Sequence, residues 1–83
     1  MHSVDLLNEA LALAEKSGFE IRNEHLQEAT GGACRIGEKW LLFVDHSLPA
    51  PEQLTQVVRA LRISRIVQPE ANTSSTLRQL LTQ

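Results

Sequence analysis

Apolar positions in the first part of the chain recur with the spacing of one face of a helix. That stripe consists of Leu6, Leu7, Ala10, Leu11, Leu13 and Ala14. The pattern predicts an amphipathic helix that lays this face on a core. Ser3 or Asp5 can cap its start, and Gly18 follows where a left-handed residue often closes a helix. We therefore predict a helix from about Val4 to Ser17.

The middle of the chain changes to the alternation that is typical of strands. Phe19–Arg22 alternates apolar and charged residues, which predicts a short, half-buried strand at the edge of a sheet. Two apolar runs, Ala33–Ile36 and Trp40–Val44, flank Gly37-Glu38, a pair that suits a two-residue turn with a positive φ at the glycine. We predict a β-hairpin here. The polar stretch Asn23–Thr30 is expected to be mostly irregular.

The turn sets the hairpin register, and the register sets which side chains share a face. We expect Ile36 to lie opposite Lys39. One face is predicted to carry Cys34, Ile36, Leu41 and Phe43. The other face is predicted to carry Ala33, Arg35, Trp40, Leu42 and Val44. The second strand is thus apolar on both sides, which is typical of a strand that is covered on both faces. We expect the helices to cover the first face, and either the C-terminal segment or a second copy of the protein to cover the other.

A second amphipathic helix is predicted after the hairpin. Its apolar stripe is Leu54, Val57, Val58 and Leu61. Pro51 and Glu52 suit the first helical turn, so the helix is expected to run from about Pro51 to Ile63. Ile63, Ile66 and Val67 are expected to pack on the core as a short extended piece, and Pro69–Ser74 to form a loop.

A short helix is predicted at the C-terminal end. Ser74 or Ser75 can cap it, and its apolar residues are Leu77, Leu80 and Leu81. So few residues hold a helix only when they dock on the rest of the fold. The whole pattern predicts one small α+β domain over residues 1–83: helix, short strand, hairpin, helix and short C-terminal helix, with an antiparallel sheet packed by helices.

The composition is that of a folded domain, and the charge indicates which classes of partner to expect. The chain has 83 residues, 42% of them hydrophobic and 22% charged, which is ordinary for a globular domain. Residues 1–52 hold 4 basic and 9 acidic side chains, a formal charge of −5, whereas residues 53–83 hold 4 basic and 1 acidic, a charge of +3. This asymmetry can orient a partner. A pI near 5.8 lacks the basic surplus typical of nucleic-acid binding, so that class of partner is not expected.

A single cysteine excludes an internal disulfide and suits a reducing compartment. The first residues lack the basic segment and apolar run of a secretion signal, and no run of residues is apolar enough to predict a membrane span. We therefore expect a cytoplasmic location and no membrane partner.

Cys34 is the first candidate for chemistry, because Arg35, His25 or His46 could activate a thiolate. The predicted register instead places Cys34 among apolar side chains, which favours a buried, inert thiol. His25, Cys34 and His46 are separated by 9 and 12 residues, a spacing that matches no compact zinc-binding pattern. We expect no catalytic residue, no metal ligand and no cofactor.

Arginines offer two further features. Arg59, Arg62 and Arg65 recur every third residue, which predicts either a basic ridge or, more simply, a solvated helix face. Arg35 is expected to lie opposite Trp40 and to form a cation–π contact, a pair that also suits an interface.

Two resemblances follow from these motifs. The segment from Gly31 to Leu61, with its Gly-Gly-x-Cys-Arg start, resembles small conserved bacterial proteins of unassigned function, and this resemblance implies no reaction. The order of elements is also similar to the core of minimal zinc-peptidase-like domains, whose last helix bears His-Glu-x-x-His. The helix around Leu54 to Leu61 has neither His nor Glu at such a spacing, so the resemblance carries no metal chemistry to this chain.

The sequence therefore favours a noncatalytic protein-interaction or self-association module, with a homodimer as one form. The residues expected to contact the partner are Arg35, Trp40, Leu42 and Val44. The alternative is a small thiol- or metal-dependent enzyme that uses Cys34 with His25 or His46.

Overall fold

A computed structural model describes residues 2–24, 32–64 and 73–82. It begins with α1 (Ser3–Lys16), which buries the predicted apolar stripe except for Leu11, which is half-buried. The helix ends at Lys16, and the backbone N–H of the next residue, Ser17, donates to the carbonyl oxygens of Leu13 and Ala14 at 3.1 Å. Gly18 follows with φ +106°, a left-handed conformation that a side chain would strain. The predicted first helix and its glycine stop are therefore confirmed.

Three strands form one sheet: β1 (Phe19–Glu24), β2 (Gly32–Ile36) and β3 (Lys39–Asp45), in the order β1-β3-β2. The hairpin has the predicted register, with Cys34 opposite Leu41 and Ile36 opposite Lys39. Gly37 turns the chain with φ +63°. β1 lies at an edge, as its mixed pattern predicted. Asn23 and Glu24, which were expected to be irregular, extend β1, and residues 25–31 lie outside the described part of the chain.

The α+β class and the order of the elements are confirmed, but the sheet is mixed, whereas the sequence predicted an antiparallel one. β2 pairs antiparallel with β3, and β1 pairs parallel with β3, with Phe19 beside Trp40 and Ile21 beside Leu42. β3 takes the centre because it is the strand that is apolar on both faces. The sequence did not determine whether β1 runs parallel or antiparallel to β3, because alternation in a single strand carries no information about the direction of its neighbour.

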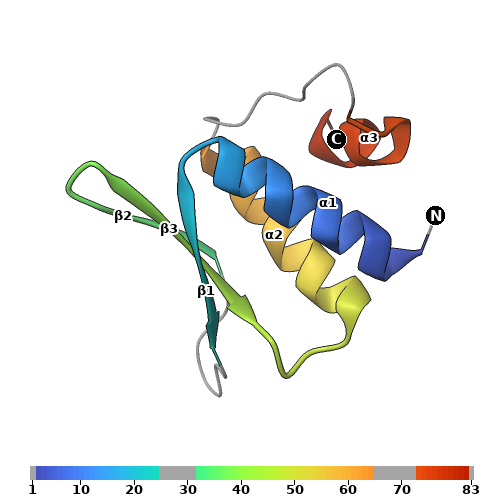
Figure 1. The fold of residues 1–83 in the computed structure, drawn as a ribbon, viewed down its shortest axis with the longest axis horizontal. Helices are drawn as coiled ribbons and strands as arrows, with labels where there is room; N and C mark the ends of the chain where they lie inside the picture. The colour runs from blue at the N-terminus through green and yellow to red at the C-terminus, as the bar shows by residue number, and fades with distance from the viewer. Residues whose placement is uncertain (1, 25–31, 65–72, 83) are drawn as a thin grey trace.

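The second helix, α2 (Ala50–Ser64), lies beside α1, and the two cover one face of the sheet (Figure 1). They cover the face of Phe19, Leu42 and Val44, which are all buried in the main core. The expectation that the helices pack on the Cys34 face is therefore wrong. The predicted hairpin register is correct, but β3 is apolar on both faces, so its sequence did not show which face the helices would cover. Ile36, on the uncovered side, is 62% exposed.

The short helix α3 (Ser75–Thr82) docks on α2 and α1, on the side away from the sheet (Figure 1). Leu77 is fully buried there. Among the described residues α3 contacts no strand, so it is not the cover expected for the second face of the hairpin. Ile63 is helical and 71% exposed, so it does not form the predicted extended piece, and residues 66 and 67 lie outside the described ranges.

Candidate interaction surface

The outer face of the sheet, the face turned away from α1 and α2, combines an apolar centre with a charged border. Leu41 and Phe43 come from β3, and Cys34 and Ile36 from β2. Glu20 and Arg22 of β1 lie beside them, because the parallel register sets these two residues next to Leu41 and Phe43. Leu41 is buried yet stands apart from the main core cluster, whereas Phe43 is half-buried and Cys34 is exposed. Apolar and charged side chains therefore lie next to each other on the outer face of the sheet.

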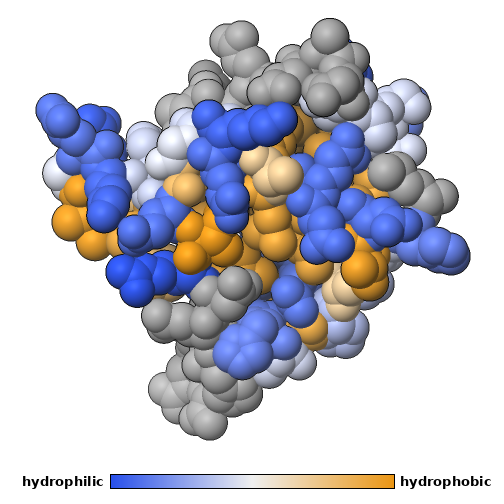
Figure 2. Space-filling view, in the orientation of Figure 1, coloured by the Kyte–Doolittle hydropathy of each residue, from blue (hydrophilic) through white to orange (hydrophobic). Residues whose placement is uncertain are grey.

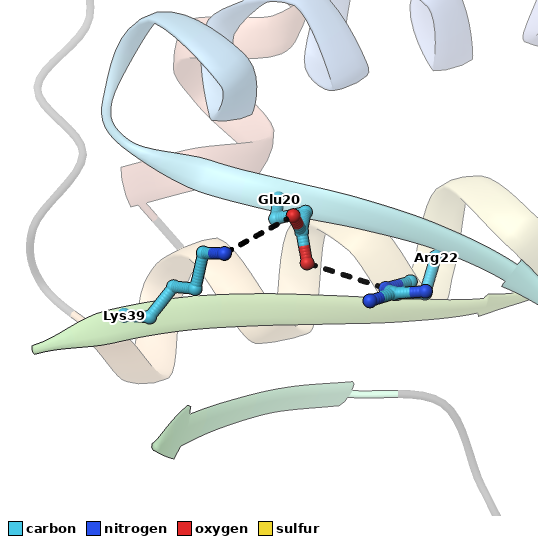
Figure 3. Close-up of polar contacts among 3 residues, drawn as sticks. All are labelled: Glu20, Arg22 and Lys39. Atoms are coloured by element: carbon cyan, nitrogen blue, oxygen red, sulfur yellow. Dashed lines mark hydrogen bonds and ion pairs between the residues drawn. The ribbon is translucent and has the colours of Figure 1, made fainter. Parts of the chain in front are cut away.

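An ion-pair cluster joins β1 to β3 on this face (Figure 3). The Glu20 carboxylate lies between two cations, with Oε1 3.4 Å from Lys39 Nζ and Oε2 3.2 Å from Arg22 Nε. Lys39, by hydrogen bond and by charge, and Arg22 to a smaller extent hold the pKa of Glu20 below its usual value. All three side chains remain open to solvent, so the cluster marks a hydrated border of the sheet.

The β2 edge, the side of β2 that does not pair with β3, ends the sheet. β2 pairs with no strand other than β3 in the described chain, and its residues are half-buried at Gly32 and Ala33 and exposed from Cys34 to Ile36. Figure 2 shows apolar surface at the end of the hairpin, next to hydrophilic side chains. An exposed edge strand with unpaired backbone groups is a ready template for another strand.

Arg35 and Trp40 lie on the helix-facing side of the hairpin, in the predicted contact. Arg35 Cζ is 5.9 Å from the centre of the Trp40 ring, and Arg35 Nε donates a 2.9 Å hydrogen bond to the Gly37 carbonyl oxygen. The Trp40 ring lies 5.8 Å from that of Phe19, at 57°. Trp40 is therefore half-buried between β1 and Arg35, and the expected cation–π pair is confirmed.

The four residues expected to contact a partner do not form one open surface. Leu42 and Val44 are fully buried beneath the helices, Trp40 is half-buried and Arg35 is exposed. A partner that approaches from outside can reach Arg35 and part of Trp40 only. On the opposite face Ile36 is the exposed large apolar residue, whereas Leu41 is buried and Phe43 is half-buried.

Cys34 is exposed, which corrects the expectation of a buried thiol. The hairpin register was right, but the helices cover the other face. The chain does not bring His46 to this thiol: Asp45, the residue before it, lies about 13 Å along β3 from the position opposite Cys34, at about 3.3 Å per residue. His25 falls outside the described residues.

Asp45 serves the turn after β3. Its Oδ1 accepts hydrogen bonds from the Ser47 N–H at 3.0 Å and the Ser47 hydroxyl at 2.5 Å, and its own N–H donates to Gln56 Oε1 at 3.1 Å. Over the described ranges, no three His, Cys, Asp or Glu side chains gather closely enough to hold a metal ion.

A groove between α2 and α3 is the second candidate. It has a volume of about 360 Å³ and is lined by Leu54, Thr55, Val58, Arg59, Arg62 and Leu80. The sequence marked Arg59 and Arg62 only as a ridge or a solvated face. The sequence did not predict the position of α3, which brings Leu80 into the same groove as these arginines.

Comparison of the chain with protein-family models, with curated proteins and with solved structures found no match. Within the described part of the chain, no helix is long and apolar enough to cross a membrane. The fold itself therefore defines the class: a compact α+β domain with a mixed, three-stranded sheet packed against helices.

Proposed function

We propose that this protein is a small noncatalytic interaction module that self-associates by pairing the β2 edges of two copies. The observation that supports this most strongly is the exposure of β2, an edge strand open to solvent from Cys34 to Ile36. Two such edges related by a two-fold axis would join two three-stranded sheets into one continuous sheet.

β2 is a better edge for this pairing than β1. β1 carries Glu20 and Arg22 on the outer face, and charged side chains along an edge strand oppose the approach of another strand. β2 has one charged residue, Arg35, and its guanidinium is engaged with Trp40 and the Gly37 carbonyl. The β2 edge is thus the less protected of the two.

The hairpin register also selects a symmetry axis. With a two-residue turn, Ile36 and Lys39 close the hairpin as a hydrogen-bonded pair, and pair types alternate from there. The backbone groups of Ala33 and Arg35 then point to the free edge. If the two-fold axis passes between the two copies of Cys34, Ala33 of each copy pairs with Arg35 of the other. If the axis passes between the two copies of Arg35 instead, two like charges lie opposite each other.

This arrangement would place the two Cys34 residues side by side. In a non-hydrogen-bonded antiparallel pair the Cα atoms are about 4.5 Å apart, within the range that a disulfide spans. Cys34 therefore becomes a probe of the interface. Mild oxidation of the native protein at high concentration should link two chains rapidly.

The first test is the mass in solution by light scattering across a wide concentration range. We expect a concentration-dependent rise toward twice 9.2 kDa, because so short an edge buries little surface. Cys34→Lys should abolish the rise by placing two ammonium groups across the axis, and Cys34→Ser should keep it. A protein that stays at 9.2 kDa up to millimolar concentration overturns the proposal.

A second pair of variants separates edge pairing from contact through the outer face. Ala33→Pro removes an N–H on the free edge and should block the dimer, while Ala33→Ser retains that N–H and should not. Circular dichroism confirms that each variant is folded. A dimer that Ala33→Pro leaves intact, or in which Cys34 does not cross-link, would show that the copies meet elsewhere.

The alternative, an enzyme that uses Cys34 with His25 or His46, has the exposure of Cys34 in its favour. Exposure alone also makes a thiol easy to label, so a labelling rate does not separate the two functions. A thiolate enzyme needs a base or cation that activates the sulfur. His46 is carried away from Cys34 by β3, and we therefore do not favour this function.

A further inference from the structure

We propose that the groove between α2 and α3 binds a small amphiphilic anion, an alkyl chain that ends in a carboxylate. The groove has two distinct walls. Leu54 and Val58 stand one helical turn apart on α2, and Leu80 of α3 faces them to complete an apolar floor. Thr55, Arg59 and Arg62 form a parallel polar row along the same helix. The groove therefore offers an apolar channel beside a cationic rim.

The two arginines of the rim are available for a ligand. Both side chains are exposed, and neither takes part in an ion pair or a side-chain hydrogen bond in the described chain. The acidic side chain of α2 is Glu52, in the first helical turn, whereas Arg62 lies in the last. α3 has no acidic residue. The lining residues of the groove thus carry two positive charges and no negative one, and a negative group complements them.

Its size favours a small ligand over a protein segment. A volume of about 360 Å³ is at the lower end for small-molecule sites, which span about 300–1,000 Å³. The three apolar side chains of the groove can contact an alkyl chain, and a guanidinium matches a planar carboxylate with two parallel hydrogen bonds.

This inference is independent of the proposed self-association. The groove belongs to α2 and α3, and α3 lies on the side of the helices away from the sheet (Figure 1). No residue of the groove belongs to β2. Loss of ligand binding would therefore leave the mass of the protein in solution unchanged, and a monomeric protein could still bind the ligand.

The test is a titration of the ¹⁵N-labelled full chain with decanoate below its micelle concentration, followed by amide chemical shifts. We expect saturable shifts concentrated at residues 54–62 and 77–81. Decyltrimethylammonium, with the same chain and the opposite charge, should not reproduce them, and neither should acetate, which lacks the chain. Equal binding of the cationic amphiphile would overturn the inference, because any apolar surface would then suffice.

Variants locate the anionic head group. Arg59→Gln and Arg62→Gln should each weaken decanoate binding by about tenfold or more, since each removes a charge-assisted hydrogen bond. Both side chains are exposed, so the fold should survive, which circular dichroism checks. Arg22→Gln, on the outer face of the sheet, is the matched control and should not change the affinity. Affinity that is unaffected in the Arg59 and Arg62 variants, or shifts that appear on the sheet instead, would refute the site.

Discussion

Glu9 of α1 holds the start of α3 through Ser74. Its Oε2 accepts the Ser74 backbone N–H at 2.8 Å and its Oε1 accepts the Ser74 hydroxyl at 2.6 Å, a contact between residues 65 positions apart in the chain. The same hydroxyl oxygen accepts the Leu77 N–H at 3.2 Å, as an N-cap does. One carboxylate therefore orients the capping residue, and the buried Leu77 anchors the helix behind it.

Replacing the capping serine should loosen α3. We expect Ser74→Ala to lower the free energy of unfolding by about 1–2 kcal/mol, because it removes the cap and leaves Glu9 without the hydroxyl donor. Urea unfolding measures this change, and amide exchange should rise first in residues 75–82. Ser75→Ala is the control: Ser75 is exposed, and its replacement should change stability by less than about 0.5 kcal/mol.

The two faces of the hairpin should differ sharply in their tolerance of truncation. Leu42 is fully buried and Ile36 is 62% exposed, although both are large aliphatic residues of the same hairpin. Leu42→Ala should cost about 2–5 kcal/mol of unfolding free energy, because it leaves a cavity beneath the helices. Ile36→Ala should cost about 0.5 kcal/mol or less in dilute solution, where no second copy covers it. Equal costs would mean that both faces are covered.

The sequence did not predict which of these two faces the helices cover. The stripes of α1 and α2 and the Gly37 turn are local signals, so the helices and the hairpin register were predictable from them. The choice of the covered face depends on β1. Once β1 is parallel to β3, Phe19 and Ile21 share the face of Leu42, and the charges of Glu20 and Arg22 belong outside. That pairing is non-local, and no spacing within the chain encodes it.

The candidate sites were only partly predictable for the same reason. Cys34 and Ile36 were placed together on one face, and Arg35 was placed against Trp40, because the hairpin alone decides those neighbours. The groove needs α3 beside α2, which depends on the contact between Glu9 and Ser74 and on Leu77. Residues that meet through the docking of a short helix leave no periodic signal in the sequence.

Gly37 should be the less replaceable of the two hairpin glycines. Its φ of +63° lies in the left-handed region, whereas Gly32 in β2 has no positive φ, and an added Cβ would meet no atom within 4 Å at either position. Gly37→Ala should therefore cost about 1 kcal/mol or more through backbone strain alone. Gly32→Ala should be close to neutral, and Gly37→Asn should recover part of the loss, since Asn tolerates this conformation. Urea unfolding of the three variants gives the ranking, and equal stability of both alanine variants would contradict it.

Glu20 should make the stability of the sheet depend on pH. Lys39 and Arg22 hold its pKa in the folded protein below the ordinary value of 4.5, so folding favours the charged carboxylate. A depressed pKa contributes stability that is fully present above the unfolded value and is lost as the pH falls through the folded one. The difference in unfolding free energy between the protein and its Glu20→Gln variant should therefore be constant near neutral pH and decline once the pH drops below 4.5. Added salt should shrink it, because the cluster is open to solvent.

The partners of Glu20 can be ranked by the same titration. Lys39 contributes most to the shift, so Lys39→Gln should return the pKa of Glu20 further toward its ordinary value than Arg22→Gln does. Carboxyl ¹³C shifts followed from neutral to acidic pH report that pKa directly. If Arg22→Gln had the larger effect, the 3.2 Å contact along β1 would dominate over the 3.4 Å contact across to β3, and the cluster would do little to join the two strands.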